Sequence, residues 1–320
     1  GCPSGWCSCP TRPAGAASDS GSSTTDDLTN VATPTIRVTF NAAQVEAAGG
    51  QLVTLLSNGV SVGSATLTSA NVAAGFVDIT ASTLGADGAK SLVATIRDNA
   101  GNTSAASTAL SVTLDGTAPS QPAISSVGGP DSIASAVAGD TLVSGTAEAG
   151  STVTLASGAT VLGTATANGQ GAFSYTLTAA NIATLGQGTG KSITAVATDA
   201  AGNASQSSTA FAFAVDTLGP AVTAVRVVPG SDPTDLSYGR DEIVRIAVDF
   251  DEAVSVSGVA PVLQVRLGSA TVIAAFDATR SSATSLVFGY RVQSTDLDGN
   301  GIALSDLSLS GGLSDIAGNA

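Results

Sequence analysis

A five-residue phrase, Asp-x-Ala-Gly-Asn, occurs three times in this chain, at residues 98–102, 199–203 and 315–319. The first two copies lie 101 residues apart, from 98 to 199, and residues 90–98 superpose on residues 191–199 at the same offset. Internal repeats of this length indicate a tandem array of small folded units. At about 100–200 residues per domain, a chain of 320 residues allows two or three domains, and the repeat selects three.

The repeat also sets the domain boundaries. The same offset carries Asp115, followed by Gly-Thr-Ala-Pro, onto Asp216, followed by Thr-Leu-Gly-Pro, so each of these phrases closes one unit. We therefore predict a first repeat at residues 17–115, a second at residues 116–217 and a divergent third at residues 218–320.

Residues 1–16 are predicted to be a disordered leader outside the repeats. This segment holds all three cysteines of the chain, Cys2, Cys7 and Cys9. Three thiolates are one ligand short of a closed zinc site, and the chain has no His to complete it. One disulfide with an odd thiol is therefore the favoured alternative, and the repeats themselves are expected to fold without disulfides.

The repeats have the pattern of β-strands. Short runs rich in Val, Ile, Thr and Ala alternate apolar and polar residues, as at residues 193–197, 211–215 and 243–250, and turn residues separate them. This pattern predicts an all-β fold of antiparallel sandwiches. Helical periodicity is scarce, and only residues 69–72 and 179–182 are expected to form a helical turn.

The third unit shows the alternation most clearly. Residues 243–250 place Val244, Ile246, Val248 and Phe250 on one face, with Asp249 on the other. Three further strands of the same pattern are expected at residues 262–267, 272–276 and 286–292. A unit of about 100 residues buries roughly two-thirds of the surface that its unfolded chain exposes, which is enough to fold alone.

Charge and composition exclude several classes of function. The net charge is −14 and the 11 basic residues are spread along the chain, so nucleic acid is not an expected partner. No apolar run reaches 18 residues, so membrane insertion is not expected either. The chain has no His and few aromatic residues, which removes the usual catalytic triads and sugar-binding platforms, and we predict that it is not an enzyme.

Asp greatly outnumbers Glu among the acidic residues. Of 25 acidic residues only four are Glu, at positions 46, 148, 242 and 252. Asp favours turns and is a short oxygen ligand for calcium. The sharpest local motif is Asp296-Leu-Asp298-Gly-Asn300-Gly, which supplies the first half of a calcium loop. The second half is missing because Leu307 stands where the closing Glu belongs, so a polar turn remains the alternative.

Other acidic and glycine-rich motifs have simpler explanations. Asp in the Asp-x-Ala-Gly-Asn phrases can cap its own turn, and the Gly-Asn that follows suits positive φ. Residues 188–192 resemble a phosphate loop but lack its first Gly, so a hairpin turn is expected. The carboxylates of Asp249, Asp251 and Glu252 are expected to lie on a solvated surface, since the two aspartates share the face opposite Phe250.

Together these phrases resemble a known family. Residues 18–30, residues 145–155 and the closing Asp-x-Ala-Gly-Asn are similar to the immunoglobulin-like repeats of very large bacterial surface adhesins and biofilm-associated proteins. The resemblance covers about residues 17–320. It implies tandem immunoglobulin-like β-sandwich domains, and since that family's final strand should follow Ala320, it implies a third sandwich that lacks its last strand and has an unpaired edge.

The resemblance also implies calcium at the junctions between repeats. Carried over to this sequence, it places Asp98 and Asp115 near the first junction, and Asp199 and Asp216 near the second. Three further aspartates would lie at the start of the first repeat, namely Asp19, Asp26 and Asp27. Calcium is thus the expected cofactor, and its predicted ligands are Asp98, Asp115, Asp199, Asp216, Asp296, Asp298 and Asn300.

We therefore predict a structural stalk or spacer segment of a secreted bacterial adhesin that supports cell adhesion or biofilm formation at the cell surface. Its expected partners are neighbouring repeats of the same polypeptide and a host or biofilm surface ligand. Two alternatives remain. The third repeat, which holds Tyr238 and Tyr290 and most of the Arg residues, could bind a host glycan or protein, or the chain could be an accessory region of an extracellular enzyme.

Overall fold

The computed structural model describes residues 8–13, 18–137, 139–229, 238–267, 270–296 and 302–320. The chain divides into two compact units. Unit 1 contains residues 1–125, 144–175 and 193–210, and unit 2 contains residues 126–143, 176–192 and 211–320. Residues of the second repeat belong to both units.

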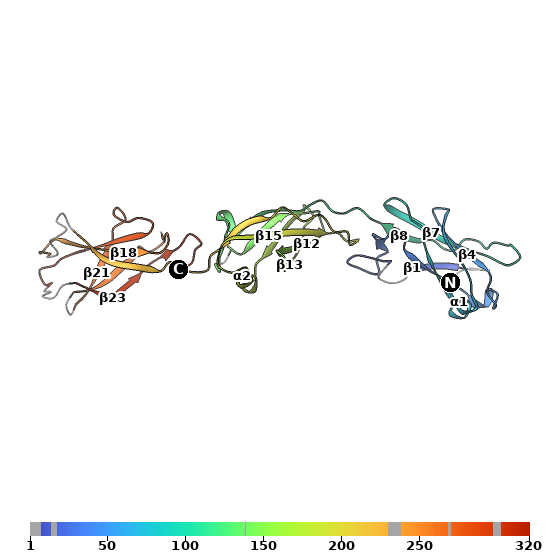
Figure 1. Ribbon diagram of the computed structural model, residues 1–320, viewed down its shortest axis with the longest axis horizontal. Coiled ribbons are helices and arrows are strands. Elements are labelled where there is room, and N and C mark those ends of the chain that lie inside the picture. The colour runs from blue at the N-terminus through green and yellow to red at the C-terminus, as the bar shows by residue number, and fades with distance from the viewer. Residues whose placement is uncertain (1–7, 14–17, 138, 230–237, 268–269, 297–301) are drawn as a thin grey trace. The chain divides into compact units, whose positions relative to one another are not determined.

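The first repeat, in unit 1, is made of two sheets. The smaller has the order β1-β3-β6 and the larger β2-β8-β7-β4-β5, in which β4, β7 and β8 run side by side (Figure 1). The neighbours are antiparallel except that β2 is parallel to β8. The strands are β1 Ser8–Pro13, β2 Leu28–Thr29, β3 Thr35–Phe40, β4 Leu52–Ser57, β5 Val60–Thr66, β6 Phe76–Thr80, β7 Gly88–Arg97 and β8 Leu110–Leu114.

Alternation along these strands builds the core of the first repeat. Strand β3 buries Ile36 and Val38 fully, and β4 buries Val53 and Leu55 in the same way from the other sheet. Each such side chain stabilises the fold by about 1.5–3 kcal/mol relative to an exposed position. The core therefore lies between the two sheets, as an antiparallel sandwich requires.

Strand β1 lies within residues 1–16, which we expected to be a leader outside the repeats. It pairs antiparallel with β3, from Ser8 opposite Phe40 to Pro13 opposite Ile36. Residues 8–13 therefore belong to the first sandwich as an edge strand of its smaller sheet. The boundaries between the three repeats stay predictions.

The second repeat has the same sheet orders, β14-β11-β9 and β10-β16-β15-β12-β13. In unit 1, β12 pairs with β13 and with the second half of β15, and in unit 2, β10 pairs parallel with β16. The strands are β9 Ala123–Val127, β10 Ile133–Ala134, β11 Leu142–Thr146, β12 Thr152–Ser157, β13 Thr160–Thr166, β14 Ala172–Thr176, β15 Gly188–Thr198 and β16 Phe211–Val215. The glycine-rich residues 188–192 thus begin a strand, not a phosphate loop.

Two short helices confirm the expected helical turns, α1 Ser69–Ala74 and α2 Ala179–Leu185. Each begins with a Thr whose hydroxyl accepts from the backbone N–H of an Asn three residues later, while that Asn side chain accepts from the Thr backbone. This reciprocal capping satisfies two of the N–H groups that a helix leaves free at its start. Two 3-10 turns, η1 Ala42–Gln44 and η2 Gly129–Asp131, complete the helical content of the described residues.

The third repeat, in unit 2, has a sheet of order β17-β18-β22-β21-β20-β23 and a small pair, β19-β24. Strand β18 has the predicted bounds. Its Val244 and Ile246 are buried in one core together with Phe288 of β22. Strand β23 lies at one edge of this sheet, and the absence of a final strand from the third sandwich stays a prediction. The strands are β17 Val222–Val228, β18 Ile243–Phe250, β19 Ser255–Val256, β20 Val262–Leu267, β21 Ala270–Phe276, β22 Ser285–Arg291, β23 Ile302–Ser310 and β24 Leu313–Ser314.

Candidate metal centre

The three Asp-x-Ala-Gly-Asn phrases form three closing loops, at residues 98–102, 199–203 and 315–319, with one hydrogen-bond pattern. In each, the Asp backbone N–H donates to the Asn carbonyl, at 2.9, 3.1 and 2.9 Å. The Asn backbone N–H donates to one Asp carboxylate oxygen at 2.7, 2.8 and 2.8 Å, and the Asn amide donates to the other at 2.9, 2.8 and 2.8 Å. Asp and Asn therefore fix each other at the two ends of the loop.

The Gly of each loop makes this closure possible. Gly101, Gly202 and Gly318 have φ of +96°, +94° and +83°. This is the left-handed region, which Gly adopts without the steric cost that a side chain would bring. The simple structural explanation of the phrase is thus confirmed: the Asp closes its own loop and Gly permits it.

The second and third closing loops also bind the linker that precedes their repeat. The Asn203 amide donates to the backbone carbonyl of Asp115 at 2.8 Å in unit 1. The Asn319 amide donates to the carbonyl of Asp216 at 3.0 Å in unit 2. The two aspartates that the sequence placed at the ends of repeats are therefore held by their main-chain carbonyls.

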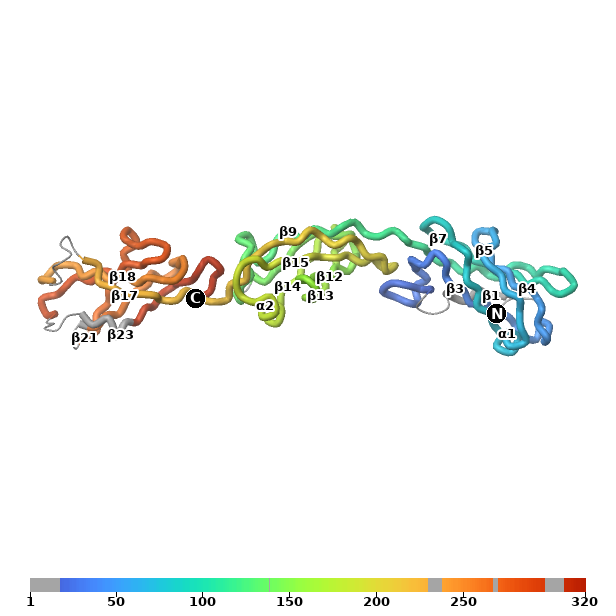
Figure 2. The backbone as a smooth tube through the Cα atoms, in the orientation of Figure 1, coloured from blue at the N-terminus to red at the C-terminus, as the bar shows by residue number. Residues whose placement is uncertain are grey.

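The second linker, residues 216–220, joins β16 to β17. Asp216 follows β16 directly, and its carboxylate accepts from the Gln187 amide at 2.5 Å and from the backbone N–H of Leu218 at 3.3 Å. Figure 2 shows the C-terminus beside this linker, and a Cβ placed on Gly219 would lie 2.8 Å from the carbonyl oxygen of Ala320. The third closing loop and the second linker are thus packed together within unit 2.

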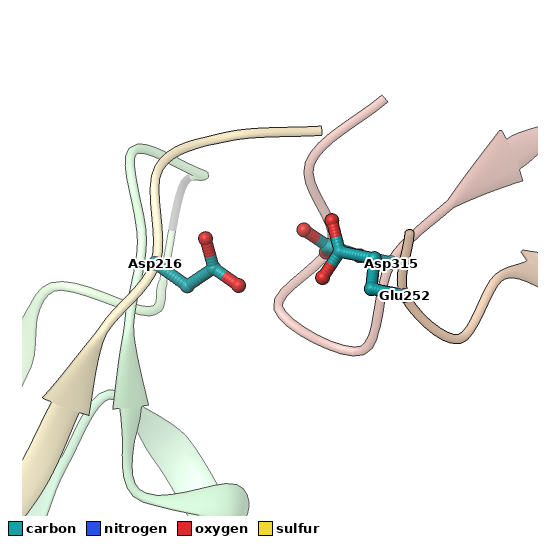
Figure 3. Close-up of side chains that lie close together, drawn as sticks. All are labelled: Asp216, Glu252 and Asp315. Carbon is teal, nitrogen blue, oxygen red and sulfur yellow. The ribbon is translucent and has the colours of Figure 1, made fainter. Parts of the chain in front are cut away.

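Three carboxylates meet at this linker. Oxygen atoms of Asp216, Glu252 and Asp315 all lie within 4.8 Å of one another, and Figure 3 shows the Asp216 carboxylate directed toward the other two. Glu252 lies two residues beyond the end of β18, and Asp315 follows β24 and opens the third closing loop. Asp315 is buried, and the other two are partly buried. We call these three residues the carboxylate cluster.

The electrostatics of the carboxylate cluster favour a cation. Burial raises the pKa of Glu252 above its ordinary value, and the negative charges of Asp216, Asp315 and Asp251 raise it further. Like charges at this distance disfavour one another's ionisation, and a divalent cation would reverse that effect. Calcium takes carboxylate oxygens as ligands in flexible geometry, so the donor set fits calcium, with Asp216, Glu252 and Asp315 as its ligands.

The first linker, residues 115–119, has different chemistry. The carboxylate of Asp87 accepts from the backbone N–H of Gly116 at 2.8 Å and from the Thr117 hydroxyl at 2.5 Å. The second closing loop also receives residues from the start of the first repeat, because its Ala200 and Ala201 carbonyls accept from the Ser22 N–H at 3.2 Å and the Ser20 hydroxyl at 2.9 Å. Within the described residues, no comparable group of three acids forms around Asp115 or Asp199.

The structure therefore separates the predicted ligands. Of the predicted set, Asp216 is in the carboxylate cluster, whereas Asp98, Asp115 and Asp199 lie in closing loops or the first linker. Asp296 accepts from the Tyr290 hydroxyl at 2.8 Å and from the Gln293 N–H at 2.6 Å. Its predicted co-ligands, Asp298 and Asn300, lie outside the described residues.

The three aspartates expected at the start of the first repeat differ in solvent exposure. Asp19 is buried, with 1% of its surface exposed, and Asp27 is partly buried with a positive φ of 58°. Asp26 is exposed and accepts from the backbone N–H of Leu28 at 3.2 Å. These three residues therefore do not share one solvated surface.

Sequence reasoning missed two members of the cluster. Asp315 was recognised in the repeated phrase but was not chosen as a ligand, and Glu252 was expected on a solvated surface. Position after a strand does not by itself mark the ligand, because Glu148 follows β11 by two residues, as Glu252 follows β18, and is in no such group within the described residues. Two of the four glutamates thus occupy equivalent positions in successive repeats.

The tyrosines of the third repeat do not form an open binding platform. Tyr238 and Tyr290 are partly buried and pack against the core of that repeat. Two arginines of the third repeat are in ion pairs, Arg226 with Asp249 at 3.1 Å and Arg280 with Asp277 at 2.9 Å. A recognition surface built on these two tyrosines therefore has no support in the described residues.

Family comparisons agree with the fold. Residues 7–116 match the bacterial Ig-like domain family, and residues 129–214 match a family of bacterial Ig domains. The chain therefore belongs to the proteins built from tandem bacterial immunoglobulin-like domains. No curated protein was found to match it, and no helix in the described ranges is long and apolar enough to cross a membrane.

Several solved structures are similar to the chain at low identity. One is from a 1.5-MDa bacterial ice-binding adhesin, with 17% identity, 83% coverage of both chains and a TM-score of 0.33. Another is a Ca²⁺-stabilized adhesin with which an Antarctic bacterium binds ice, at 22% identity, with 98% of this chain and 74% of that chain covered and a TM-score of 0.41. A tetra-tandem repeat in the extending region of a large adhesion protein has 20% identity, the same coverages and a TM-score of 0.26.

Proposed function

We propose that this chain is a structural spacer segment of a secreted bacterial adhesin, in which immunoglobulin-like repeats follow one another and calcium stiffens the second linker. The observation that carries the proposal is the carboxylate cluster, because one of its members belongs to the linker itself. Asp216 ends the second repeat, whereas Glu252 and Asp315 belong to the third. A cation bound here would tie the linker to the repeat that follows it.

Calcium would supply positive charge and flexible oxygen coordination at this point. The residues of the chain prepare the site in three ways. Asn319 holds the Asp216 carbonyl at 3.0 Å, Gln187 orients the Asp216 carboxylate at 2.5 Å, and the third closing loop fixes Asp315 through both of its oxygens. The preorganised carboxylates repel one another without a cation, so a bound ion both removes the repulsion and restricts bending of the linker.

The rest of the chain is suited to a spacer at the cell surface. A net charge of −14 keeps neighbouring acidic chains apart and soluble, and 4% aromatic residues leave little material for a recognition surface. Independent sandwiches joined by short linkers move relative to each other unless the linker is restrained. A role in cell adhesion or biofilm formation follows if the spacer carries an adhesive domain away from the cell.

The proposal is tested by calcium titration of the full chain with isothermal calorimetry, together with small-angle X-ray scattering with calcium and with excess chelator. Calcium is expected to bind and to narrow the distribution of molecular dimensions, and Glu252→Gln should weaken both effects. A matched control is Asp241→Asn, which removes one carboxylate that lies before the start of β18, while Glu252 follows its end. Calcium binding that Asp241→Asn reduces as much as Glu252→Gln, or no binding at all, would contradict the calcium site.

A further inference from the structure

The second and third closing loops show what such a loop binds. Each donates its Asn amide to the backbone carbonyl of the Asp that ends the preceding repeat, Asp115 in one case and Asp216 in the other. Each also buries the methyl group of its Ala, since Ala201 is 0% exposed and Ala317 2% exposed. Each of these two loops thus binds its linker through one amide donor and has a buried Ala, and the second loop also accepts from the Ser22 N–H and the Ser20 hydroxyl.

The first closing loop has the same internal structure and neither feature. Its Asn102 amide donates to Asp98 at 2.9 Å, as in the other loops, but within the described residues it has no linker carbonyl to bind. Asn102, the counterpart of Asn203 and Asn319, is exposed. Ala100, the counterpart of the buried Ala201 and Ala317, is exposed as well. A hollow of about 250 Å³ lies at this loop, lined by Asp98, Asn102, Thr103 and Ser104.

We infer that the first closing loop, residues 98–102, is a docking site for the aspartate-ended linker of another immunoglobulin-like repeat. The occupied loops define the occupant: the end of a strand followed by Asp, whose main-chain carbonyl accepts from the Asn amide of the loop. The segment Leu114-Asp115-Gly116-Thr117 of this chain has that chemistry. The Asp98 carboxylate lies beside the Asn102 amide, so a neutral carbonyl fits the site better than a free anion.

The loop is ready for its occupant before the occupant arrives. Hydrogen bonds from the Asn102 side chain and backbone hold the pKa of Asp98 below its usual value, which shows that the ionised, closed form of the loop is favoured. The Asn99 amide donates to Glu46 at 2.6 Å and fixes the next residue of the loop as well. A preorganised loop loses little conformational freedom on binding, so a short peptide can report on the site.

The test is nuclear magnetic resonance of the ¹⁵N-labelled full chain titrated with a capped peptide of residues 112–119, Val-Thr-Leu-Asp-Gly-Thr-Ala-Pro. Saturable shifts are expected at residues 98–104. Residues 199–203 and 315–319 serve as internal controls, because those loops already hold their own linkers and should not shift. A peptide of the same composition in scrambled order controls for non-specific contact.

Two exposed positions make the result decisive. Asn102→Ala removes the amide donor without adding a charge beside Asp98, leaves the Asn102 backbone bond that closes the loop, and is expected to weaken peptide binding at least about fivefold, the value of one hydrogen bond of about 1 kcal/mol. Ala100→Glu places bulk and charge in the exposed loop two residues from the Asn102 donor and is expected to abolish the shifts. The inference is overturned if residues 98–104 do not respond, if all three loops respond alike, or if both variants bind the peptide as the parent does. Calcium is absent from this experiment, so its result is independent of the proposed calcium site.

Discussion

The two linkers come from the same repeated sequence but are held by different chemistry. In the first, the carboxylate of Asp87 accepts from the Gly116 N–H and the Thr117 hydroxyl. In the second, Gln187 takes the equivalent place, and its carboxamide oxygen accepts from the Thr217 N–H at 3.0 Å and hydroxyl at 3.1 Å. The exchange of a carboxylate for an amide thus keeps the hydrogen bonds that hold the linker and removes one negative charge beside it.

The exchange matters because of what surrounds each linker. The amide nitrogen of Gln187 donates to the Asp216 carboxylate, a contact that a carboxylate at this position could not make. Asp216 is thereby oriented while Glu252 and Asp315 complete the carboxylate cluster. The comparison indicates that hydrogen bonds from Asp87 or Gln187 hold both linkers, whereas three carboxylates close to one another are found, within the described residues, at the second linker.

The largest difference is expected from the first aspartate of the closing loops. Asp315→Ala should abolish the stabilisation of the chain by calcium, a loss of about 2.7 kcal/mol when free calcium is 100-fold above its Kd. It also leaves the N–H groups of Asn319 without their acceptors in a buried loop, which costs a further ~1–3 kcal/mol. Thermal unfolding with millimolar calcium and with chelator measures both parts.

Asp199→Ala is the matched variant at the first linker. It breaks the same hydrogen bonds within its loop, so it should destabilise the chain with chelator present, but it should leave the calcium-dependent rise in place. Equal loss of that rise in Asp199→Ala and Asp315→Ala would show that the two linkers do not differ in metal chemistry.

A smaller effect on stability is expected from Glu252→Gln, and it should be stabilising with chelator and destabilising with calcium. Because the pKa of Glu252 is raised in the folded chain, its ionised form is disfavoured there, and stability falls as pH rises through that pKa. With chelator at neutral pH the uncharged Gln should therefore stabilise the chain, by less than about 1 kcal/mol since the group is partly solvated.

With calcium the same variant should be less stable than the parent, because one ligand is lost. The measurement is the unfolding midpoint of both proteins in the two conditions. Destabilisation in both conditions would mean that Glu252 contributes packing and no repulsion, and the carboxylate cluster would lose its main electrostatic argument.

Much of the fold could be predicted from the sequence because its signals are local. Strand β18 was predicted at residues 243–250 and is found there, since period-two alternation of Val, Ile and Phe is visible without any tertiary information. The helical turns at α1 and α2 were predictable for a similar reason. Strand β1 was missed because Ser8–Pro13 contains Cys, two Pro and Arg in place of such alternation, and only its pairing with β3 defines it.

The site was less predictable because it depends on contacts between distant residues. The sequence indicated the repeated Asp residues, but it could not show that Asp216 meets Glu252 and Asp315, which follow two different strands of the next repeat. Strand alternation correctly placed Asp249 on the face of β18 opposite Phe250, where it pairs with Arg226. It gave no information on Glu252, which lies beyond the end of the strand, where alternation no longer applies.

The smallest expected effect is a difference in the pH response of the hydrogen bonds that Asp87 and Gln187 accept from the two linkers. Hydrogen bonds from the Thr117 hydroxyl and then the Gly116 N–H hold the pKa of Asp87 below its ordinary value of 3.8. For a carboxyl with a lowered pKa, the stabilisation is present above the unfolded pKa and is lost as pH falls through the folded one. The first linker should therefore loosen on acidification below about pH 4.

At the second linker the acceptor is Gln187, which does not titrate. The Thr217 N–H should therefore keep its acceptor over the same pH range. Amide chemical shifts and hydrogen exchange of Gly116, Thr117 and Thr217, followed from neutral to acid pH, measure this difference. Asp87→Asn should flatten the response of Gly116 and Thr117 without moving the unfolding midpoint at neutral pH, since an amide oxygen can still accept both bonds. A parallel acid response at Thr217 would instead assign the loosening to Asp216 and its neighbours, and the exchange of Asp for Gln would no longer distinguish the two linkers.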